Sequence, residues 1–506
     1  MSSQRANILL VTTDQQRTDT LGCYGSPWAG TPHLDALAAG GVCCERAYTT
    51  NPVCTPARVS LFTGLQVSRH GAWNIGMNAP GQTRTVAHRL AELGYRTHNI
   101  GKMHFQAYGS DEDKSLEAFV RWTRPEPPPF SGPYYGFQTV EFAIGHATYG
   151  LRGHYGSWVR SQVDETTYRS YEKAEALSAM SFGGEGYEWD LPLRLHNSVW
   201  TADRALHFLQ ERDPSQPFFL TLGFQDPHHP HCLPRDFSNR IDPSAVPLPD
   251  YTEGELDDKP AHFEIARRGG LETSAFRGEY PIAGQGNGGD YRKVTDKDAR
   301  LGRSYYYGMV RLIDEQMGRV LRYLDENGLA DNTLVIFTSD HGEMLGDHGL
   351  WMKGPFHYEQ ILRIPLLLRW PRGFAGGLRT SGIVSHLDLV PTILTAAGAA
   401  PDATLDGFNA LPLFRRETDR IRDGAMIECI DDPHKLRLKT YVTPDRKLTW
   451  YNGQPFGELY DLVLDPREKI NRWNDPAYAD DKHRLLARIL EKLEPLEYRA
   501  ERDCYA

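Results

Sequence analysis

Three stretches of the chain are continuously apolar, and a polar cluster follows each of them. They run from Asn7 to Asp14, from Pro217 to Phe224 and from Thr333 to Asp340. A short apolar run of this kind is typical of a strand buried on both faces of a parallel sheet. Because ligands of open α/β sheets bind beyond the carboxyl ends of the strands, we expect the three polar clusters to line one crevice.

The pattern changes from about residue 420, where short predicted strands alternate with turn residues. The strands are Ala425–Ile430, Leu436–Val442, Lys447–Tyr451 and Glu458–Leu464, and the helix that follows carries Leu485, Leu486, Ile489, Leu490 and Leu493 on one face. Residues 107–195 and 232–298 have little periodicity, and we expect them to be long excursions that shape a pocket mouth. The prediction is an α/β fold, with a large and mostly parallel central sheet flanked by helices in residues 1–415. A smaller antiparallel sheet with a helix is expected in residues 416–506.

Composition and charge narrow the function classes. The chain has 56 Lys and Arg against 66 Asp and Glu, a net charge of −10 without a basic block, which argues against nucleic-acid binding. No stretch approaches the ~18 apolar residues of a membrane span, and Asp14 interrupts the first apolar run before a signal peptide could form. The seven cysteines form no Cys-x-x-Cys pair, so free thiols in a reducing cytoplasm are expected.

Cys54 is predicted to lie at the start of a helix. Pro56 suits a first helical turn and Gly64 suits the end, and Arg58 follows Cys54 by one turn on the same face. Free backbone N–H groups and the positive end of the helix dipole make such a position suitable for an anion or a nucleophile. A buried cysteine beside an ordinary helical arginine is the alternative.

The phrase Cys54-Thr-Pro-Ala-Arg58, followed by Ser60-Leu-Phe-Thr-Gly64, resembles the signature of the sulfatase family of the alkaline phosphatase superfamily. The resemblance covers most of the chain in order, through Asp14, Gly101–Phe105, Pro227–Pro230, Ser339–Gly342 with Lys353, and Leu459–Leu462 with Asp465. In that family the cysteine is oxidised to formylglycine, whose hydrated aldehyde is the nucleophile. The resemblance therefore implies an alkaline-phosphatase-like fold and a formylglycine-generating maturation enzyme as a partner.

A metal site is expected where Asp14, Asp340 and His341 meet. Two carboxylates and one imidazole suit Ca²⁺ or Mn²⁺ better than Zn²⁺, although each residue alone is more typical of a cap or turn. The family's usual pattern has paired aspartates and Asp-Asn, whereas this chain has Asp14-Gln15 and Asp340-His341. The resemblance thus implies a site of Asp14, Gln15, Cys54, Asp340 and His341, one unit less negative, as in choline sulfatases and phosphonate monoester hydrolases.

Lys102 and His104 distinguish these two branches. They lie two positions apart after a strand-like run, so their side chains should point the same way. In sulfatases this pair contacts the sulfate and supplies the base that releases it, whereas phosphonate monoester hydrolases lack the pair. The pair favours cleavage of sulfate esters.

The resemblance assigns the remaining tasks to Arg58, His228 and Lys353. Arg58 would steady the nucleophile, while His228 and Lys353 would hold the ester oxygens and one of them would protonate the departing alcohol. A zinc cluster of His228, His229 and His231 is the less favoured alternative, because Pro230 breaks any helix that would align them.

The predicted function is therefore hydrolysis of a small sulfated substrate through formylglycine 54 and one divalent cation. Hydrolysis of phosphonate monoesters or phosphodiesters is the first alternative, and a non-catalytic anion-binding relative is the second. The aromatic residues of the excursions suit an aryl group, a sugar or a quaternary ammonium. We also expect a homo-oligomer.

Overall fold

The central sheet has eight strands, and most of them are parallel. The computed structural model describes residues 5–177, 186–269, 289–431 and 436–493. Along the sheet the order is β13-β2-β12-β10-β1-β8-β4-β5. The parallel strands are β10 (Thr333–Ser339), β1 (Asn7–Thr13), β8 (Phe218–Gly223), β4 (Arg96–Gly101) and β5 (Thr139–Ile144). The mixed edge is built from β12 (Leu366–Arg369), β2 (Val42–Cys44) and β13 (Leu378–Thr380).

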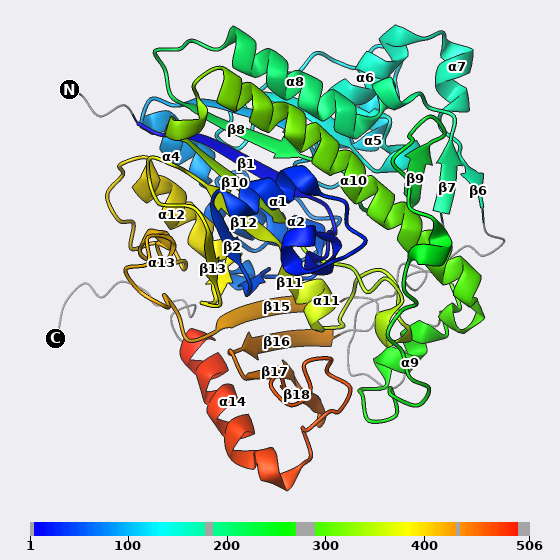
Figure 1. Ribbon diagram of the computed structural model, residues 1–506, viewed down its shortest axis with the longest axis vertical. Helices are drawn as coiled ribbons and strands as arrows, with labels where there is room; N and C mark the ends of the chain where they lie inside the picture. Colours follow the sequence, from blue (N-terminus) through cyan, green and yellow to red (C-terminus); the bar gives the residue numbers. More distant parts are fainter. Residues whose placement is uncertain (1–4, 178–185, 270–288, 432–435, 494–506) are drawn as a thin grey trace.

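Helices cover both faces of this sheet because its central strands are apolar on both sides. In β1, Leu9 and Val11 face one core, while Ile8 and Leu10 face another. The first core is closed by α10 (Asp296–Glu326), α8 (Asn197–Glu211) and α1 (Pro32–Ala39) (Figure 1). The second is closed by α2 (Cys54–Thr63), α4 (Val86–Glu92) and α12 (Leu389–Ala396). The prediction of strands buried on both faces is confirmed.

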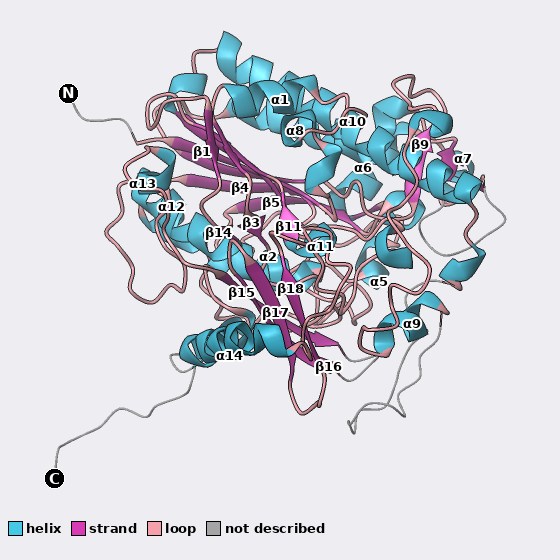
Figure 2. Cartoon of the chain, turned by 60° about the horizontal axis from the view of Figure 1, so that its bottom comes forward, coloured by secondary structure: helices cyan, strands magenta, loops and turns pink. Residues whose placement is uncertain are grey.

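The C-terminal part is a four-stranded antiparallel sheet with one covering helix, as predicted. Its strands are β15 (Ala425–Asp431), β16 (Leu436–Val442), β17 (Arg446–Tyr451) and β18 (Gly457–Asp461), and its helix is α14 (Ala479–Leu493). Figure 2 shows α14 packed along this sheet. Leu485 and Ile489 are buried against it, but Leu490 is 63% exposed and not on the packed face. Leu490 follows Ile489 by one residue, about 100° around the helix, which turns it to solvent.

The first predicted excursion contains more regular structure than its composition indicates. Residues 107–195 contribute β5 to the edge of the central sheet, and they also form several helices and short strands. These are α5 (Phe119–Trp122), α6 (Gly153–Gln162), α7 (Glu165–Ser170), β6 (Glu175–Ala176) and β7 (Gly186–Trp189). The second excursion begins within β9 (His231–Pro234), which pairs with β7, and contains α9 (His262–Arg267). Residues 178–185 and 270–288 of the two excursions lie outside the described residues.

The remaining strands and α-helices are short. They are β3 (Ala47–Tyr48), β11 (Arg363–Ile364), β14 (Val384–Ser385), α3 (Val67–His70), α11 (Glu359–Leu362) and α13 (Leu411–Phe414). The three strands form a small sheet in the order β11-β3-β14. Strand β15 reaches the segment just before Cys54, because the Asn51 amide donates to the Glu428 carbonyl (2.6 Å) and the Glu428 N–H donates to the Thr50 carbonyl (2.9 Å). Among the described helices, none is both long and apolar enough to cross a membrane.

Candidate active site

Cys54 is the first residue of α2, at the place where the sequence predicts a helix N-terminus. Val53 before it is extended, and Gly64 ends the helix with φ 70°, the left-handed conformation that glycine adopts without strain. Every residue of the helix is buried. The Cys54 thiol and the Arg58 guanidinium are therefore enclosed in the protein rather than displayed at its surface.

The ends of the parallel strands bring their polar residues to this thiol. Asp14 follows β1 and His341 follows β10, and the Cys54 Sγ lies 3.5 Å from Asp14 Oδ1 and 3.2 Å from His341 Nε2. Lys353 Nζ lies 3.0 Å from the same sulfur. Burial and Asp14 raise the pKa of the Cys54 thiol, but Lys102, Lys353 and His341 outweigh them and lower it. The surroundings of this sulfur thus favour a negatively charged group at its position.

Two buried ion pairs hold the carboxylates. Arg58 Nε donates to Asp340 Oδ2 over 2.8 Å, and Lys102 Nζ pairs with Asp14 Oδ2; all four side chains are fully buried. Burial alone would raise the pKa of Asp14, but Lys102 and the hydrogen bond with His146 hold it well below its usual value. The second oxygens, Asp14 Oδ1 and Asp340 Oδ1, lie 4.0 and 3.8 Å from His341 Nε2.

These atoms fit a metal ion. One ligand atom from each of Asp14, Cys54, Asp340 and His341 lies within 4.8 Å of every other. Ligands about 2.3–2.6 Å from one Ca²⁺ are spaced in this way. Gln15, the fifth predicted ligand, accepts from Lys353 Nζ through its Oε1 (2.8 Å), and its Nε2 contacts Glu343 and His229. Its role as a ligand stays a prediction.

His228 lies between Lys353 and a backbone carbonyl, and these two contacts indicate which nitrogen of its ring carries the proton. His228 Nδ1 lies 2.5 Å from the His229 carbonyl, to which it can only donate, while its Nε2 lies 2.9 Å from Lys353 Nζ. Burial, together with His146, lowers the pKa of His228 well below its usual value. His228 is therefore a neutral ring whose Nε2 accepts, and Lys353 holds the proton that lies next to Cys54.

His104 is in a strained turn beside Lys102. Its φ is 58°, its backbone N–H donates to Glu117 Oε2 over 2.8 Å, and its ring stacks on Tyr108 with the centroids 4.0 Å apart. Within the described part of the chain its buried Nδ1 has no hydrogen-bond partner. Burial, and then Lys102, lowers the pKa of His104 well below its usual value, so the ring is neutral and able to accept a proton.

His146 is a site residue that the sequence analysis missed. It follows β5, and its Nε2 lies 2.7 Å from Asp14 Oδ2 and 2.8 Å from Lys102 Nζ. Its ring stacks on His228 with the centroids 3.6 Å apart. Burial, and then Lys102, lowers the pKa of His146 to about 3. The available signal was a histidine two residues after the stretch Val140-Glu-Phe-Ala-Ile144, in which a charged residue interrupts the apolar positions, so it is weaker than the continuous runs that marked the other strand ends.

The histidines 228, 229 and 231 are not arranged as a zinc cluster. In the described residues two groups of His, Cys, Asp and Glu are spaced for one metal, and neither contains His229 or His231. His231 lies in β9 against Tyr306. The second group, Asp14, His146 and His228, has the Lys102 ammonium in contact with its Asp14 and His146 members, which disfavours another cation there.

Comparison with known proteins gives the family. The sequence model described as Sulfatase matches residues 6–399, and the one described as N-sulphoglucosamine sulphohydrolase, C-terminal, matches residues 346–495. The chain belongs to the sulfatase family. The resemblance seen in the sequence is confirmed, and with it the hydrolase class.

Relatives in both predicted branches are similar to this sulfatase over nearly its whole length. An uncharacterized sulfatase of Escherichia coli K12, YidJ, is 30% identical over 97% of this chain and 88% of YidJ. The choline-sulfatase of Rhizobium meliloti strain 1021 is 26% identical over 96% of this chain and 86% of its own length. The crystal structure of the phosphonate monoester hydrolase of Agrobacterium radiobacter superposes with a TM-score of 0.79 at 26% identity, covering 97% of this chain and 96% of that one.

Proposed function

We propose that this sulfatase hydrolyses sulfate monoesters at the S–O bond, with formylglycine 54 as nucleophile and one divalent cation. The observation that carries the proposal is the placement of Lys102 beside Asp14, in a buried site whose helix begins at Cys54. A sulfate monoester carries one negative charge, and a cluster of the buried Lys102 and Arg58 with the half-buried Lys353 matches an anion of this kind.

Oxidation of Cys54 to formylglycine would put a hydrated aldehyde where the thiol lies, and one of its hydroxyls supplies the nucleophile. The chain's own residues orient this position. Lys353 Nζ and His341 Nε2 lie 3.0 and 3.2 Å from Sγ, and the Arg58–Asp340 pair fixes the helix against the end of β10. We infer that Lys102, His228 and Lys353 hold the non-bridging oxygens of the ester.

The structure favours Lys353 over His228 as the proton donor to the leaving alcohol. His228 Nε2 accepts from Lys353, so it has no proton to give there, whereas the Lys353 ammonium is 3.0 Å from Sγ. Burial lowers the pKa of Lys353, but Cys54 and Asp14 outweigh it and raise it, so the group is charged. Neutral His104 is the candidate base that takes a proton when sulfate is released.

Asp14, Asp340 and His341, with Gln15 beside them, are the residues that would hold the metal. Their donor set of carboxylate oxygens and one imidazole suits Ca²⁺ or Mn²⁺. A divalent cation there supplies positive charge for the oxygens of the ester and for the nucleophile. Arg58 and Lys102 position the carboxylates and are not ligands themselves. Arg58 pairs with one oxygen of Asp340 and Lys102 with one oxygen of Asp14, and the other oxygen of each carboxylate is directed toward His341.

Hydrolysis of phosphonate monoesters or phosphodiesters is the second candidate. It is supported by the likeness to the Agrobacterium radiobacter enzyme and by Gln15 and His341, which replace acidic or amide residues of the usual sulfatase pattern. The test compares kcat/KM for 4-nitrophenyl sulfate with that for 4-nitrophenyl phenylphosphonate. A larger value for the sulfate supports the proposal, and a larger value for the phosphonate reverses it.

Maturation of Cys54 is tested separately. Mass spectrometry of the peptide that contains Cys54, from protein coexpressed with a formylglycine-generating enzyme, should show the mass of formylglycine. An unmodified Cys54 under those conditions would support the non-catalytic relative instead. A small sulfated substrate, a homo-oligomer and a cytoplasmic location stay predictions.

A further inference from the structure

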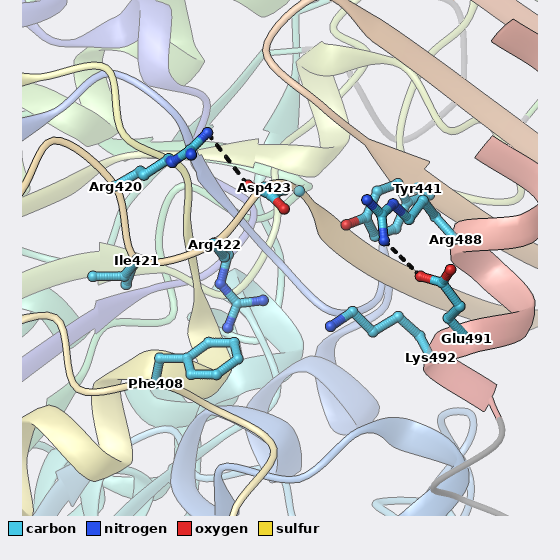
Figure 3. Close-up of a pocket in the computed structure, with 10 residues that line it drawn as sticks. Phe408, Arg420, Ile421, Arg422, Asp423, Tyr441, Arg488, Glu491 and Lys492 are labelled. Atoms are coloured by element: carbon cyan, nitrogen blue, oxygen red, sulfur yellow. Dashed lines mark hydrogen bonds and ion pairs between the residues drawn. The ribbon is translucent and has the colours of Figure 1, made fainter. Parts of the chain in front are cut away.

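A cavity lies between the C-terminal sheet and the segment that leads into it. Its volume is about 320 Å³, and it is lined by Phe408 before α13, by the loop 420–424 after it, and by residues of β16 and α14. None of its lining residues belongs to the site around Cys54. In Figure 3, Lys492 extends from α14 toward Arg422 and Phe408 on the opposite wall, while Arg488 and Tyr441 form the side of the cavity.

A smaller chamber of about 160 Å³ adjoins this cavity. The two chambers share Phe408, Arg422, Gly424 and Lys492, and Gln66 lines the inner one. The outer chamber alone reaches the lower end of the range for small-ligand pockets, about 300–1,000 Å³. The size therefore suits a small molecule rather than a single ion.

Arg422 is a buried cation with an unused donor in this cavity. Its side chain is 7% exposed, its Nη2 pairs with the buried Asp388, and its Cζ lies 5.0 Å from the centre of the Phe408 ring. Its Nε is buried and donates to no residue that the structure describes. Because a buried donor without an acceptor is costly, this N–H group calls for a ligand or water that accepts.

The remaining charges also favour an anion. Four cationic side chains, Arg420, Arg422, Arg488 and Lys492, line the outer chamber against Asp423 and Glu491. Arg420–Asp423 and Arg488–Glu491 are exposed pairs, which contribute little, and Lys492 has no ion pair with any residue of the described ranges. Arg422 pairs with Asp388, and Asp406, which lines the inner chamber, pairs with Arg69. Lys492 is therefore the lining cation whose charge no carboxylate of the described residues offsets.

Gln66 and Phe408 indicate two further features that a ligand of this cavity would need. The buried Gln66 Oε1 accepts no hydrogen bond from the described residues, so it lacks a donor such as a hydroxyl. Phe408 is 44% exposed at the boundary of the two chambers. A ligand that satisfies all of these groups has an acidic group, a hydroxyl and an apolar ring face.

We propose that this cavity is a binding site for an acidic saccharide, separate from the catalytic site. The sulfate or carboxylate lies between Arg422 and Lys492, a hydroxyl reaches Gln66, and the sugar ring covers Phe408. The assignment does not depend on the proposed hydrolysis, because the two sites share no residue.

The test is saturation-transfer NMR on the full chain carrying Cys54→Ala and Lys102→Ala, which removes turnover and weakens anion binding at the first site. The probes are glucose 6-sulfate, glucuronic acid, glucose and inorganic sulfate. We expect at least one acidic sugar to bind, and Lys492→Glu and Gln66→Leu to raise its Kd about tenfold. Arg484→Gln, which removes a cation of α14 outside the cavity, is the matched control and should leave Kd unchanged.

Binding of glucose 6-sulfate alone or glucuronic acid alone supports the site and identifies the acid. An unchanged Kd in Lys492→Glu overturns the proposal, and so does equal binding of glucose or of inorganic sulfate, since either would show that the combination of acid and sugar is not recognised. If Gln66→Leu does not fold, Lys492→Glu decides, because Lys492 is at the surface of α14 without a structural partner in the described residues. Turnover of 4-nitrophenyl sulfate by Lys492→Glu in otherwise unchanged protein should stay within about twofold of the original.

Discussion

Replacing Arg58 by methionine should destabilise the protein and weaken metal binding at the proposed site together. Arg58 Nε donates to Asp340 Oδ2 over 2.8 Å, Nη1 donates to the Lys102 carbonyl over 3.2 Å, and both charged side chains are fully buried. Methionine fills most of the volume, so the main effect is an unpaired Asp340 carboxylate. Loss of one partner of a buried ion pair costs about 3–5 kcal/mol.

A double-mutant cycle measures the pairing itself. Asp340→Asn keeps an oxygen for the N–H groups of Gln15 and His341, which donate over 2.9 Å each, but it removes the charge. The double variant Arg58→Met/Asp340→Asn should therefore recover about 2 kcal/mol relative to the sum of the single variants. The free energy of unfolding is measured in urea with a chelator present, so that metal binding does not add to the folded state.

Mn²⁺ affinity is the second measurement on the same variants. Since Arg58 holds one oxygen of Asp340 and leaves the other toward His341, Arg58→Met should weaken Mn²⁺ binding by about 10–100-fold. A cost of less than about 1 kcal/mol for Arg58→Met, or an additive cycle with unchanged Mn²⁺ affinity, would show that Arg58 neither stabilises Asp340 nor positions it.

Three further outcomes are expected. Cys54→Ala should lose nearly all turnover of 4-nitrophenyl sulfate while its circular dichroism and Tm stay close to those of the parent, and full activity would sink the formylglycine assignment. Lys102→Ala and His104→Ala should each lower kcat/KM for the sulfate ester by about 10²-fold or more, since the first removes charge stabilisation and the second removes the base. Wild-type rates in both variants would contradict the preference for sulfate over phosphonate esters. Burial raises the pKa of Asp314 to about 7, so its folded form is protonated at mild acidity, and its contribution to stability is lost as pH rises from about 4 to 7. Asp314→Asn, which keeps an acceptor for the Leu34 N–H at the start of α1, should be more stable than the parent above pH 7 and lose this pH dependence in urea unfolding; a parallel profile for both proteins would contradict the assignment.

Much of the framework was predictable from local pattern. The strands before Asp14 and Asp340 were identified because each is a continuous apolar run, and the start of α2 was identified because Pro56 and Gly64 bracket it. Strand β5 was missed because its apolar residues are embedded in a segment rich in Gly, Pro and Tyr, where composition outweighed a six-residue alternation. His146 was missed with it, since a residue at the end of an unrecognised strand gives no sign that it faces the crevice.

Contacts between distant residues followed from tertiary structure alone. Lys353 was assigned to the ester oxygens by resemblance, but its contacts with Cys54, His228 and Gln15 depend on how the chain after β10 returns to the site. The proton on His228 is likewise decided by one carbonyl, that of His229, at 2.5 Å. The cavity beside Arg422 gave no sequence signal, because its walls come from a loop, a strand and a helix.

The sequence by itself determined which residues stand at the ends of buried strands, that Cys54 begins a helix and to which family the resemblance points. The sequence sufficed for these features because buried strands, helix starts and the family signature are each recognised from residues that are neighbours along the chain. Only the tertiary structure decided which charged side chains pair with each other. The strand order β10-β1-β8-β4 brings together the ends of four strands, and these ends are up to about 330 residues apart in the chain. Buried charges such as Lys102 and Asp14 must find partners in that enclosed space, and the packing of the whole sheet determines which ones they find.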